Sequence, residues 1–530
     1  MATDTSVLSS CECCLSRRRL LAAGCGVCAA WAARGLLPGC SLEAGEGASA
    51  AADSTRARVR LIFACFTLKQ DRPTWPHIGY DFAPDVERVT SALRKLCPNV
   101  EFLVTAAHGP EDAQKLLDAH DADRIDGYIV HQMNNWVRVM QTIVASGKPT
   151  IVADFPFSGS GGFLVFTAGL RRQHKNFSVV SSTNVEDLAA AANCFEVVKR
   201  GDGVTDFVAA CDRVRQQRTA ASDPRPCRED TLQLAGIGQC LEAIKGVKLL
   251  TVGGAMQNVG KEIEQHLGIG VVPIGFEELS AMCEQADEGK ARQLAERWKS
   301  AARSVLIDDP DDTLAKSARL YLAQQALLEK HQAEAITINC LGGFYGGHLK
   351  AYPCLGFVEL LDVGLVGACE ADLLSTATMI VIKHLAGRPG FISDPVLDTS
   401  KRQIIYAHCV APTRMLGPAS DPNPFEILTH AEDRKGASVR SFLPADYMTT
   451  TMEIHPGRRE ILLHRAKAVE NIVIDRACRT KLAGEVVGDV EKLFTYWDQY
   501  GWHRVTFYGD LREPMRELAA ALKFTFTEEA

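Results

Sequence analysis

The sequence lacks the features that identify membrane proteins and nucleic-acid-binding proteins. After the first 40 residues, the 530-residue chain has no uninterrupted apolar run of the roughly 18 residues that a membrane-spanning helix needs. Positive charge is scarce, because 58 Lys and Arg residues stand against 65 Asp and Glu residues and give a net charge of −7. We therefore expect no membrane-spanning segment beyond an N-terminal signal, and no nucleic-acid partner.

Complete motifs for nucleotide and zinc binding are also missing. Gly159-Ser-Gly-Gly162 is not followed by Lys-Ser/Thr, which excludes a P-loop, and Gly253-Gly254 lacks the rest of a dinucleotide fingerprint. Six of the 18 cysteines lie in the first 40 residues, with no second Cys/His pair at zinc spacing. The other cysteines are scattered singly, mostly in apolar stretches, and we interpret them as small buried hydrophobic residues.

The first 58 residues are interpreted as an export signal followed by a flexible spacer. Arg17 and Arg18 form a twin-arginine pair ahead of a weakly apolar stretch, a pattern typical of export to the periplasm or cell envelope. Leu37-Pro-Gly-Cys40 is similar to a lipoprotein cleavage site, which would anchor the chain through a lipid on Cys40. The alternative is a leader without a transport role on a cytoplasmic protein.

The rest of the chain is too long for one hydrophobic core and predicts three domains of α/β class. Short β-rich runs alternate with amphipathic helical stretches, which predicts parallel sheets covered by helices. The polar residues 215–227 are interpreted as a linker. We therefore predict two Rossmann- or flavodoxin-like domains, over residues 59–225 and 226–390. Short strands separated by turns then predict a β-rich, barrel-like domain over residues 391–530.

Two carboxylates flank one predicted helix in the second domain. Asp372 is a good N-cap for a helix over residues 373–386, which Gly387 ends. Glu370 stands just before the helix N-terminus, where an anion is stabilised. Asp394 follows at the end of a short predicted strand, because a residue before proline favours an extended conformation. Carboxylates at the same ends of neighbouring elements can converge on one cation. The glycine-rich residues 339–347 predict a flexible loop of the kind that covers an active site.

Four segments resemble the L-fucose and L-arabinose isomerase family: Ala368-Cys-Glu-Ala-Asp372, Gly387-Arg-Pro-Gly-Phe-Ile-Ser-Asp394, Tyr406-Ala-His-Cys-Val-Ala-Pro412 and Gly501-Trp-His-Arg-Val-Thr-Phe-Tyr-Gly-Asp510. The resemblance implies that Glu370, Asp394 and His503 hold a metal ion. It also implies that Glu370 is the catalytic base and Asp394 its acid partner. Two carboxylates and one imidazole favour Mn²⁺ or Mg²⁺ over zinc. Members of the family assemble into oligomers, which implies a trimer to hexamer here.

The fucose-type and arabinose-type ligand sets differ at two positions. Arabinose isomerases have a glutamate where this chain has Ser393, and they add a histidine at the position of His408. The chain is therefore more similar to the fucose type. The sequence leaves two interpretations of His408, as a core residue or as a residue of the site. We also predict substrate contacts for His408, His430 and Trp75, the last of which lies in a proline-rich loop suited to stacking on a sugar.

The expected function is an aldose–ketose isomerase for a pentose, a 6-deoxyhexose or a modified hexose. The reaction needs an acidified C–H bond, a base and an acid, and positive charge beside the developing ene-diolate. One alternative is an exported sugar-binding protein without turnover, and another is a different reaction of the same metal site, such as epimerisation. At single residues, Glu370 could be an ordinary helix-start acid, Asp394 a turn cap and His503 a core histidine.

The export signal leads to a direct prediction. A fusion of the leader to a reporter that is active only outside the cytoplasm should work in the wild type and fail when Arg17 and Arg18 are both replaced by Lys, because the transport receptor reads the arginine pair. A leader with Arg19→Lys serves as the matched control. Reporter activity that survives the double replacement would rule out the twin-arginine route.

Overall fold

The computed structural model describes residues 55–254 and 257–530. The arginine pair at Arg17 and Arg18 and the cysteine at Cys40 lie outside the described residues, so the export signal stays a prediction. Within the described part of the chain, no helix is both long enough and apolar enough to cross a membrane.

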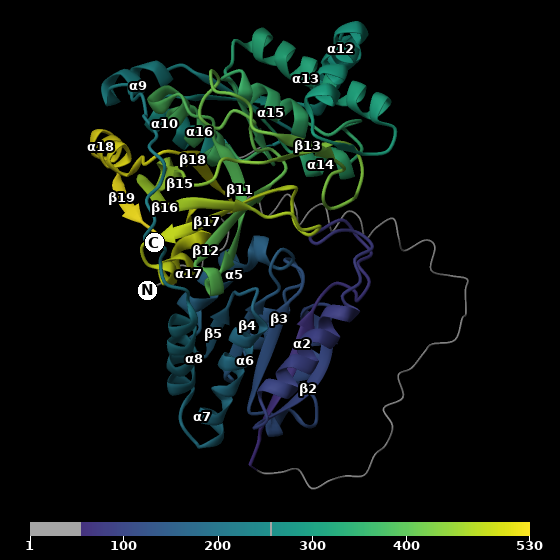
Figure 1. Cartoon of the computed structure of the whole chain (residues 1–530), viewed down its shortest axis with the longest axis vertical. Coiled ribbons are helices and arrows are strands. Elements are labelled where there is room, and N and C mark those ends of the chain that lie inside the picture. Colours follow the sequence, from purple (N-terminus) through teal and green to yellow (C-terminus); the bar gives the residue numbers. More distant parts are fainter. Residues whose placement is uncertain (1–54, 255–256) are drawn as a thin grey trace.

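The first sheet contains five parallel strands and forms the lower part of the molecule in Figure 1. Its order is β2-β1-β3-β4-β5, which is the flavodoxin-like order. The strands are β1 (Ala57–Ala64), β2 (Val100–Ala107), β3 (Gly127–Gln132), β4 (Thr150–Asp154) and β5 (Phe177–Val180). The helices between and after them are α2 (Ala83–Leu96), α3 (Pro110–Leu117), α4 (Val139–Val144), α5 (Ser160–Gln173), α6 (Val185–Asn193), α7 (Phe195–Lys199) and α8 (Val204–Arg218).

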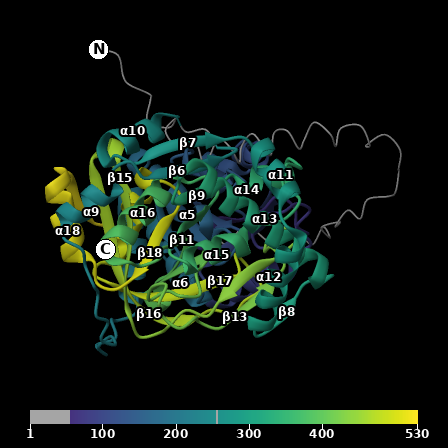
Figure 2. The same cartoon turned by 90° about the horizontal axis from the view of Figure 1, so that it is seen from above.

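The second sheet is also parallel, with the order β10-β9-β6-β7. Its strands are β6 (Lys248–Val252), β7 (Gly270–Ile274), β9 (Ala335–Ile338) and β10 (Val366–Cys369). The helices of this part are α9 (Ile237–Ile244), α10 (Gln257–Leu267), α11 (Phe276–Gln285), α12 (Glu288–Ala301), α13 (Pro310–His331), α14 (Cys340–Tyr345), α15 (Cys354–Asp362) and α16 (Leu373–Ala386). Helix α16 contacts both this sheet and the strands that follow it, and so joins the two (Figure 2).

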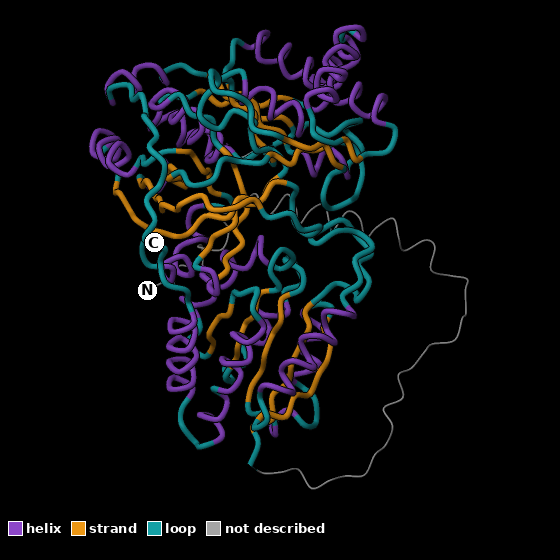
Figure 3. Tube along the Cα trace, in the orientation of Figure 1, coloured by secondary structure: helices purple, strands orange, loops and turns teal. Residues whose placement is uncertain are grey.

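Six antiparallel strands of the C-terminal region pair in a closed ring, β15-β18-β11-β12-β17-β16 and back to β15. They are β11 (Phe391–Asp398), β12 (Gln403–His408), β15 (Met448–His455), β16 (Glu460–Asn471), β17 (Thr480–Val487) and β18 (Arg504–Tyr508). Strand β19 (Thr525–Glu528) pairs with β16 after the last long helix, α18 (Arg512–Leu522). A small separate sheet contains β8 (Val305–Leu306), β13 (Phe425–Leu428) and β14 (Ser438–Ser441). Figure 3 shows these strands above the first sheet.

The mixed α/β class, the parallel sheets and the strand-rich C-terminal region are confirmed. Two local predictions need correction. The linker expected over 215–227 starts later: residues 215–218 still belong to α8, where the buried Arg215 guanidinium forms ion pairs with Asp212 and Glu491, whereas residues 219–227 contain no helix or strand, as predicted. The expected flexible loop at 339–347 contains α14, whose N-terminus is capped when the Asn339 side chain accepts a hydrogen bond from the Gly342 amide at 3.1 Å.

A buried network of charged side chains holds the start of strand β18. Arg504, at the start of β18, forms an ion pair with Glu529 at 3.3 Å, and both side chains are fully buried. The Arg504 guanidinium stacks on Trp497 and donates a hydrogen bond to the His503 carbonyl at 3.0 Å. Glu529 also accepts from His464 at 2.8 Å. Two buried charges that are paired and hydrogen-bonded in this way are costly to separate.

This network predicts different effects for two neighbouring glutamates. Glu529→Gln leaves the buried Arg504 charge without its counter-charge, so we expect the free energy of unfolding to fall by about 3–5 kcal/mol. Glu528→Gln is the matched control, because Glu528 pairs with the half-buried Arg512, and its loss should cost less than about 1 kcal/mol. Urea denaturation of the three proteins measures the difference, and equal losses in the two variants would contradict the interpretation.

Candidate metal centre and active site

Strand register brings the predicted site residues together. β11 lies between β12 and β18 in the ring. Asp394 on β11 is paired with Ala407 on β12, next to His408, and Ser393 is paired with Arg504 on β18, next to His503. Glu370 follows the last residue of β10 in the parallel sheet. Four residues from distant parts of the sequence therefore meet where the parallel sheet and the ring adjoin.

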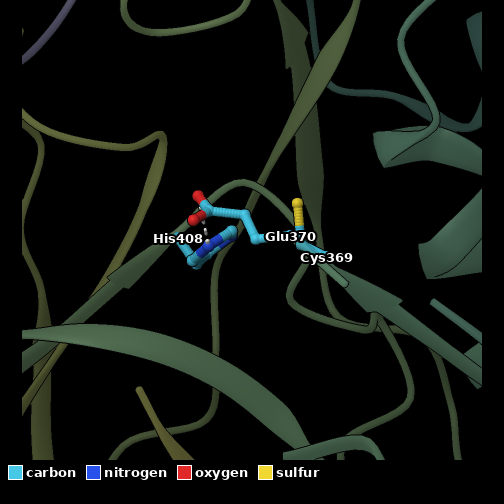
Figure 4. Close-up of side chains that lie close together, drawn as sticks. All are labelled: Cys369, Glu370 and His408. Carbon is cyan, nitrogen blue, oxygen red and sulfur yellow. Dashed lines mark ion pairs between the residues drawn. The ribbon is translucent and has the colours of Figure 1, made fainter. Parts of the chain in front are cut away.

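The polar atoms of these residues lie within the range of a shared ion. His503 Nε2 is 3.8 Å from Glu370 Oε2 and 3.7 Å from Asp394 Oδ1. His408 Nε2 is 3.8 Å from Glu370 Oε1. Two groups have potential ligand atoms all within 4.8 Å of one another, namely Asp394 with His408 and His503, and Cys369 with Glu370 and His408. Figure 4 shows the second group, with the Glu370 carboxylate beside the His408 ring.

Glu370 stands in an unusual backbone conformation. Its φ is +60° and that of Ala371 is +53°, so two successive non-glycine residues are left-handed. This conformation costs an L-residue roughly 1–2 kcal/mol, and such strain is concentrated at functional sites. The turn reverses the chain between β10 and α16. The Glu370 side chain is 16% exposed, whereas those of Asp394, His408 and His503 are at most 5% exposed.

Asp372 holds the His503 ring in place. His503 Nδ1 donates a hydrogen bond to Asp372 Oδ2 at 2.9 Å, while Asp372 Oδ1 accepts from the Ser375 amide at 3.0 Å and caps α16. Burial alone would lower the pKa of His503, but the hydrogen bond to Asp372 and the charges of Asp394 and Glu370 raise it to about 9. His503 Nε2 makes no hydrogen bond to any described residue. The sequence identified Asp372 as a cap but gave no sign of its contact with His503.

The N-terminal part of the chain supports Asp394. Trp502 Nε1 donates a hydrogen bond to Asp394 Oδ1 at 2.6 Å, and the Trp502 ring stacks on Trp136 with centroids 4.7 Å apart. A Cβ atom added to Gly161, in the first turn of α5, would lie 3.7 Å from Asp394 Oδ1. The N-terminus of α5 therefore approaches this carboxylate and places favourable positive potential beside it.

The cavity at this junction is lined by aromatic, acidic, imidazole and thiol groups. Trp75 and His430 reach it, and both are buried. His430 Nδ1 forms an ion pair with Asp433 at 3.2 Å. The prediction that the cysteines are buried holds for ten of the twelve described ones, but five of them gather here rather than being dispersed. The lining residues are Trp75, Cys340, Leu341, Phe344, Cys354, Cys369, Glu370, Asp394, His408, Cys409, His430, Glu432 and Cys478.

The Asp372–His503 contact predicts a pH effect on stability. Because the pKa of folded His503 is about 9, above its ordinary value of about 6.5, the contact should stabilise the fold fully below pH 6.5. This stabilisation should be lost as the pH rises through 9. Asp372→Asn removes the charge that raises the pKa, so unfolding free energies of the variant should change less between pH 6.5 and 9, by an amount on the order of 1–3 kcal/mol.

Urea denaturation across that pH range, with a chelator present, measures the effect. Asp433→Asn is a second test rather than a neutral control, because the hydrogen bond to Asp433 raises the pKa of buried His430 to about 9 as well, and its loss should reduce the pH dependence in the same direction. A wild-type profile as flat as that of Asp372→Asn would show that His503 does not titrate as described.

No protein-family model matches the chain. Among characterised proteins, it is similar to the sulfoquinovose isomerases of Priestia aryabhattai and Priestia megaterium, each 23% identical over 314 residues, which cover 57% of this chain and 68% of each relative. Among solved structures, the chain is similar to a solute-binding protein of an ABC transporter from Agrobacterium vitis, which was solved bound to alpha-D-tagatopyranose. The match covers 62% of this chain and 88% of the chain of that protein. Its identity of 15% and TM-score of 0.17 are too low to carry an argument. The distant similarity to the two isomerases supports a sugar isomerase and does not single out fucose or arabinose isomerases.

Proposed function

We propose that the protein is a metal-dependent aldose–ketose isomerase, which acts on a pentose, a 6-deoxyhexose or a modified hexose through an ene-diol. One observation carries the proposal: His503 Nε2 lies 3.8 Å from a Glu370 oxygen and 3.7 Å from an Asp394 oxygen, and both carboxylates line a buried cavity. The distant similarity to proteins named sulfoquinovose isomerase supports the same class of reaction.

The donor set fits a divalent cation of the Mn²⁺ or Mg²⁺ type. Two carboxylates and one imidazole supply hard oxygen ligands and one nitrogen, and leave further coordination positions open. His503 Nε2 is buried and makes no hydrogen bond within the described residues, which suits a nitrogen kept for a cation. Glu370, Asp394 and His503 would hold the ion. When bound, it would supply positive charge beside the negative charge that develops on the sugar oxygens.

Two carboxylates would move the proton. Glu370 is assigned as the base, because its side chain is the more exposed of the two, at 16% against 5% for Asp394. It would take the proton from the carbon next to the sugar carbonyl. Asp394 accepts the Trp502 hydrogen bond and is assigned as the acid. It would give a proton to the sugar carbonyl oxygen as the ene-diol forms. Asp372 keeps the His503 ring oriented throughout.

Three further residues are proposed to contact the sugar. Trp75, His408 and His430 all line the cavity. Trp75 offers a flat apolar surface that can pack against the C–H face of a sugar, and the imidazoles can hydrogen-bond to hydroxyl groups. Assembly into a homo-oligomer and export from the cytoplasm also remain proposals. The three residues at the cavity do not bear on either of them.

The test is turnover on a panel of aldoses. Protein stripped with a chelator and reloaded with Mn²⁺ should convert at least one pentose, one 6-deoxyhexose or sulfoquinovose to its ketose. Glu370→Gln should lower kcat by at least about 100-fold, because general base catalysis contributes that much or more. The readout is ketose formation followed by NMR.

The matched control is Glu453→Gln. Glu453 is buried outside the cavity lining and accepts hydrogen bonds from Ser375 and Thr378 at 3.1 and 3.2 Å. Burial and the nearby Asp372 charge raise the pKa of Glu453 well above its usual value, which favours its uncharged form, so glutamine should be tolerated. Tight sugar binding without product would favour the sugar-binding alternative, and interconversion of two aldoses would favour an epimerase.

A further inference from the structure

Two thiols meet at the wall of the cavity. Cys340 Sγ and Cys369 Sγ are 3.1 Å apart, and both residues are buried. The contact follows from the fold, because β9 and β10 are parallel neighbours in which Ile338 is paired with Cys369. Cys340 begins α14 immediately beyond β9, while Cys369 is the last residue of β10. Neither thiol has a role in the isomerase proposed above.

These thiols adjoin two other ligand-type side chains. The Cys369 sulfur, a Glu370 oxygen and a His408 nitrogen all lie within 4.8 Å of one another (Figure 4). Cys340 lies outside this group of three, but its 3.1 Å contact with Cys369 brings a second sulfur to it, so the four side chains offer two sulfurs, one carboxylate oxygen and one imidazole nitrogen. This set differs from the one proposed for the isomerase, which has no sulfur. The two sets share Glu370.

The chemistry of this set favours a thiophilic cation. Zinc binds thiolate, imidazole and carboxylate in tetrahedral sites, with zinc–sulfur distances of about 2.3 Å. Two sulfurs in such a site stand roughly 3.8 Å apart, so the 3.1 Å separation would have to open by less than 1 Å. Mn²⁺ and Mg²⁺ have little preference for sulfur. A buried pair of thiols also brings no charge of its own until a cation displaces the protons.

We propose that Cys340, Cys369, Glu370 and His408 form a second cation site, which takes Zn²⁺ or a similar thiophilic ion such as Co²⁺ or Cd²⁺. Each thiol that coordinates releases its proton to the solvent, and the two thiolates with the Glu370 carboxylate outweigh the charge of the ion. The binding itself does not depend on the isomerase function. One consequence does rest on it: because both sites need Glu370, zinc would compete with Mn²⁺ and inhibit turnover.

The experiment uses cobalt as a spectroscopic probe on the full chain. Protein reduced with a phosphine and stripped of metal is titrated with Co²⁺, and Zn²⁺ is then added to displace it. We expect the near-ultraviolet absorption of a sulfur-to-cobalt charge transfer, which Zn²⁺ removes. Cys369→Ser and Cys340→Ser should each weaken this absorption and lower the zinc affinity at least about 10-fold, a loss of the size seen when even an outer partner of a metal ligand is removed.

Cys240→Ser is the matched control, because Cys240 is buried but does not line the cavity, and its thiol contacts the Val381 carbonyl rather than another thiol. It should keep the absorption and the zinc affinity of the wild type. Circular dichroism shows whether each variant folds. A measurement on the wild type needs no variant: zinc should slow alkylation of Cys340 and Cys369, seen by peptide mass spectrometry, and leave alkylation of Cys240 unchanged.

Two results would overturn the proposal. One is cobalt binding without a sulfur charge-transfer absorption, and the other is alkylation of Cys340 and Cys369 at the same rate with and without zinc. The outcomes stay separate from those of the isomerase assay. An active isomerase without the cobalt–sulfur absorption would remove the thiol site alone, whereas the absorption without any turnover would remove the isomerase alone.

Discussion

The hydrogen bond between His503 and Asp372 joins the two parts of the molecule that build the candidate site. Asp372 follows the last strand of the parallel sheet and caps α16, whereas His503 precedes β18 in the ring of antiparallel strands. Each part has its own strand pairings, and one hydrophobic core, with α16 in it, is shared between them. The site exists only where the parts adjoin, so the relative position of α16 and β18 decides whether Glu370, Asp394 and His503 can share an ion. Beyond the packing of the shared core, one carboxylate with two partners, 2.9 and 3.0 Å away, ties the His503 ring to the start of α16.

Burial gives these contacts their strength. The side chains of Asp394, His408 and His503 are at most 5% exposed, and charges attract more strongly in a region that excludes water. The same burial makes an uncompensated carboxylate costly, and the raised pKa of His503 is one response to the surrounding negative charge. Trp502 and the N-terminus of α5 provide further compensation at Asp394. The first sheet is thereby connected to the site although it supplies none of the proposed ligands.

Local signals in the sequence predicted local structure well. Asp372, Gly387 and the apolar spacing between them gave the bounds of α16, because capping and left-handed termination depend on residues within one turn. Long-range contacts were not predictable in this way. The ion pair of Arg215 joins it to Glu491, which is far away in the sequence, and the meeting of Cys340 with Cys369 depends on which strands are neighbours. The convergence of Glu370 and Asp394 was expected from their places at the ends of neighbouring elements, whereas the addition of His503 was expected only through the family resemblance. Their role as ligands stays a prediction.

Glu370 is shared by the two cation sites proposed in the cavity. Its left-handed backbone points the carboxylate to where oxygen and nitrogen donors lie on one side and thiols lie on the other. A hard cation would be bound by Glu370 together with Asp394 and His503. A thiophilic cation would be bound by Glu370 together with Cys340 and Cys369. One carboxylate cannot serve both ions with its full charge. If both proposals hold, the ion that occupies the cavity is set by the supply of each metal in the compartment, so where the protein resides bears directly on whether it is active.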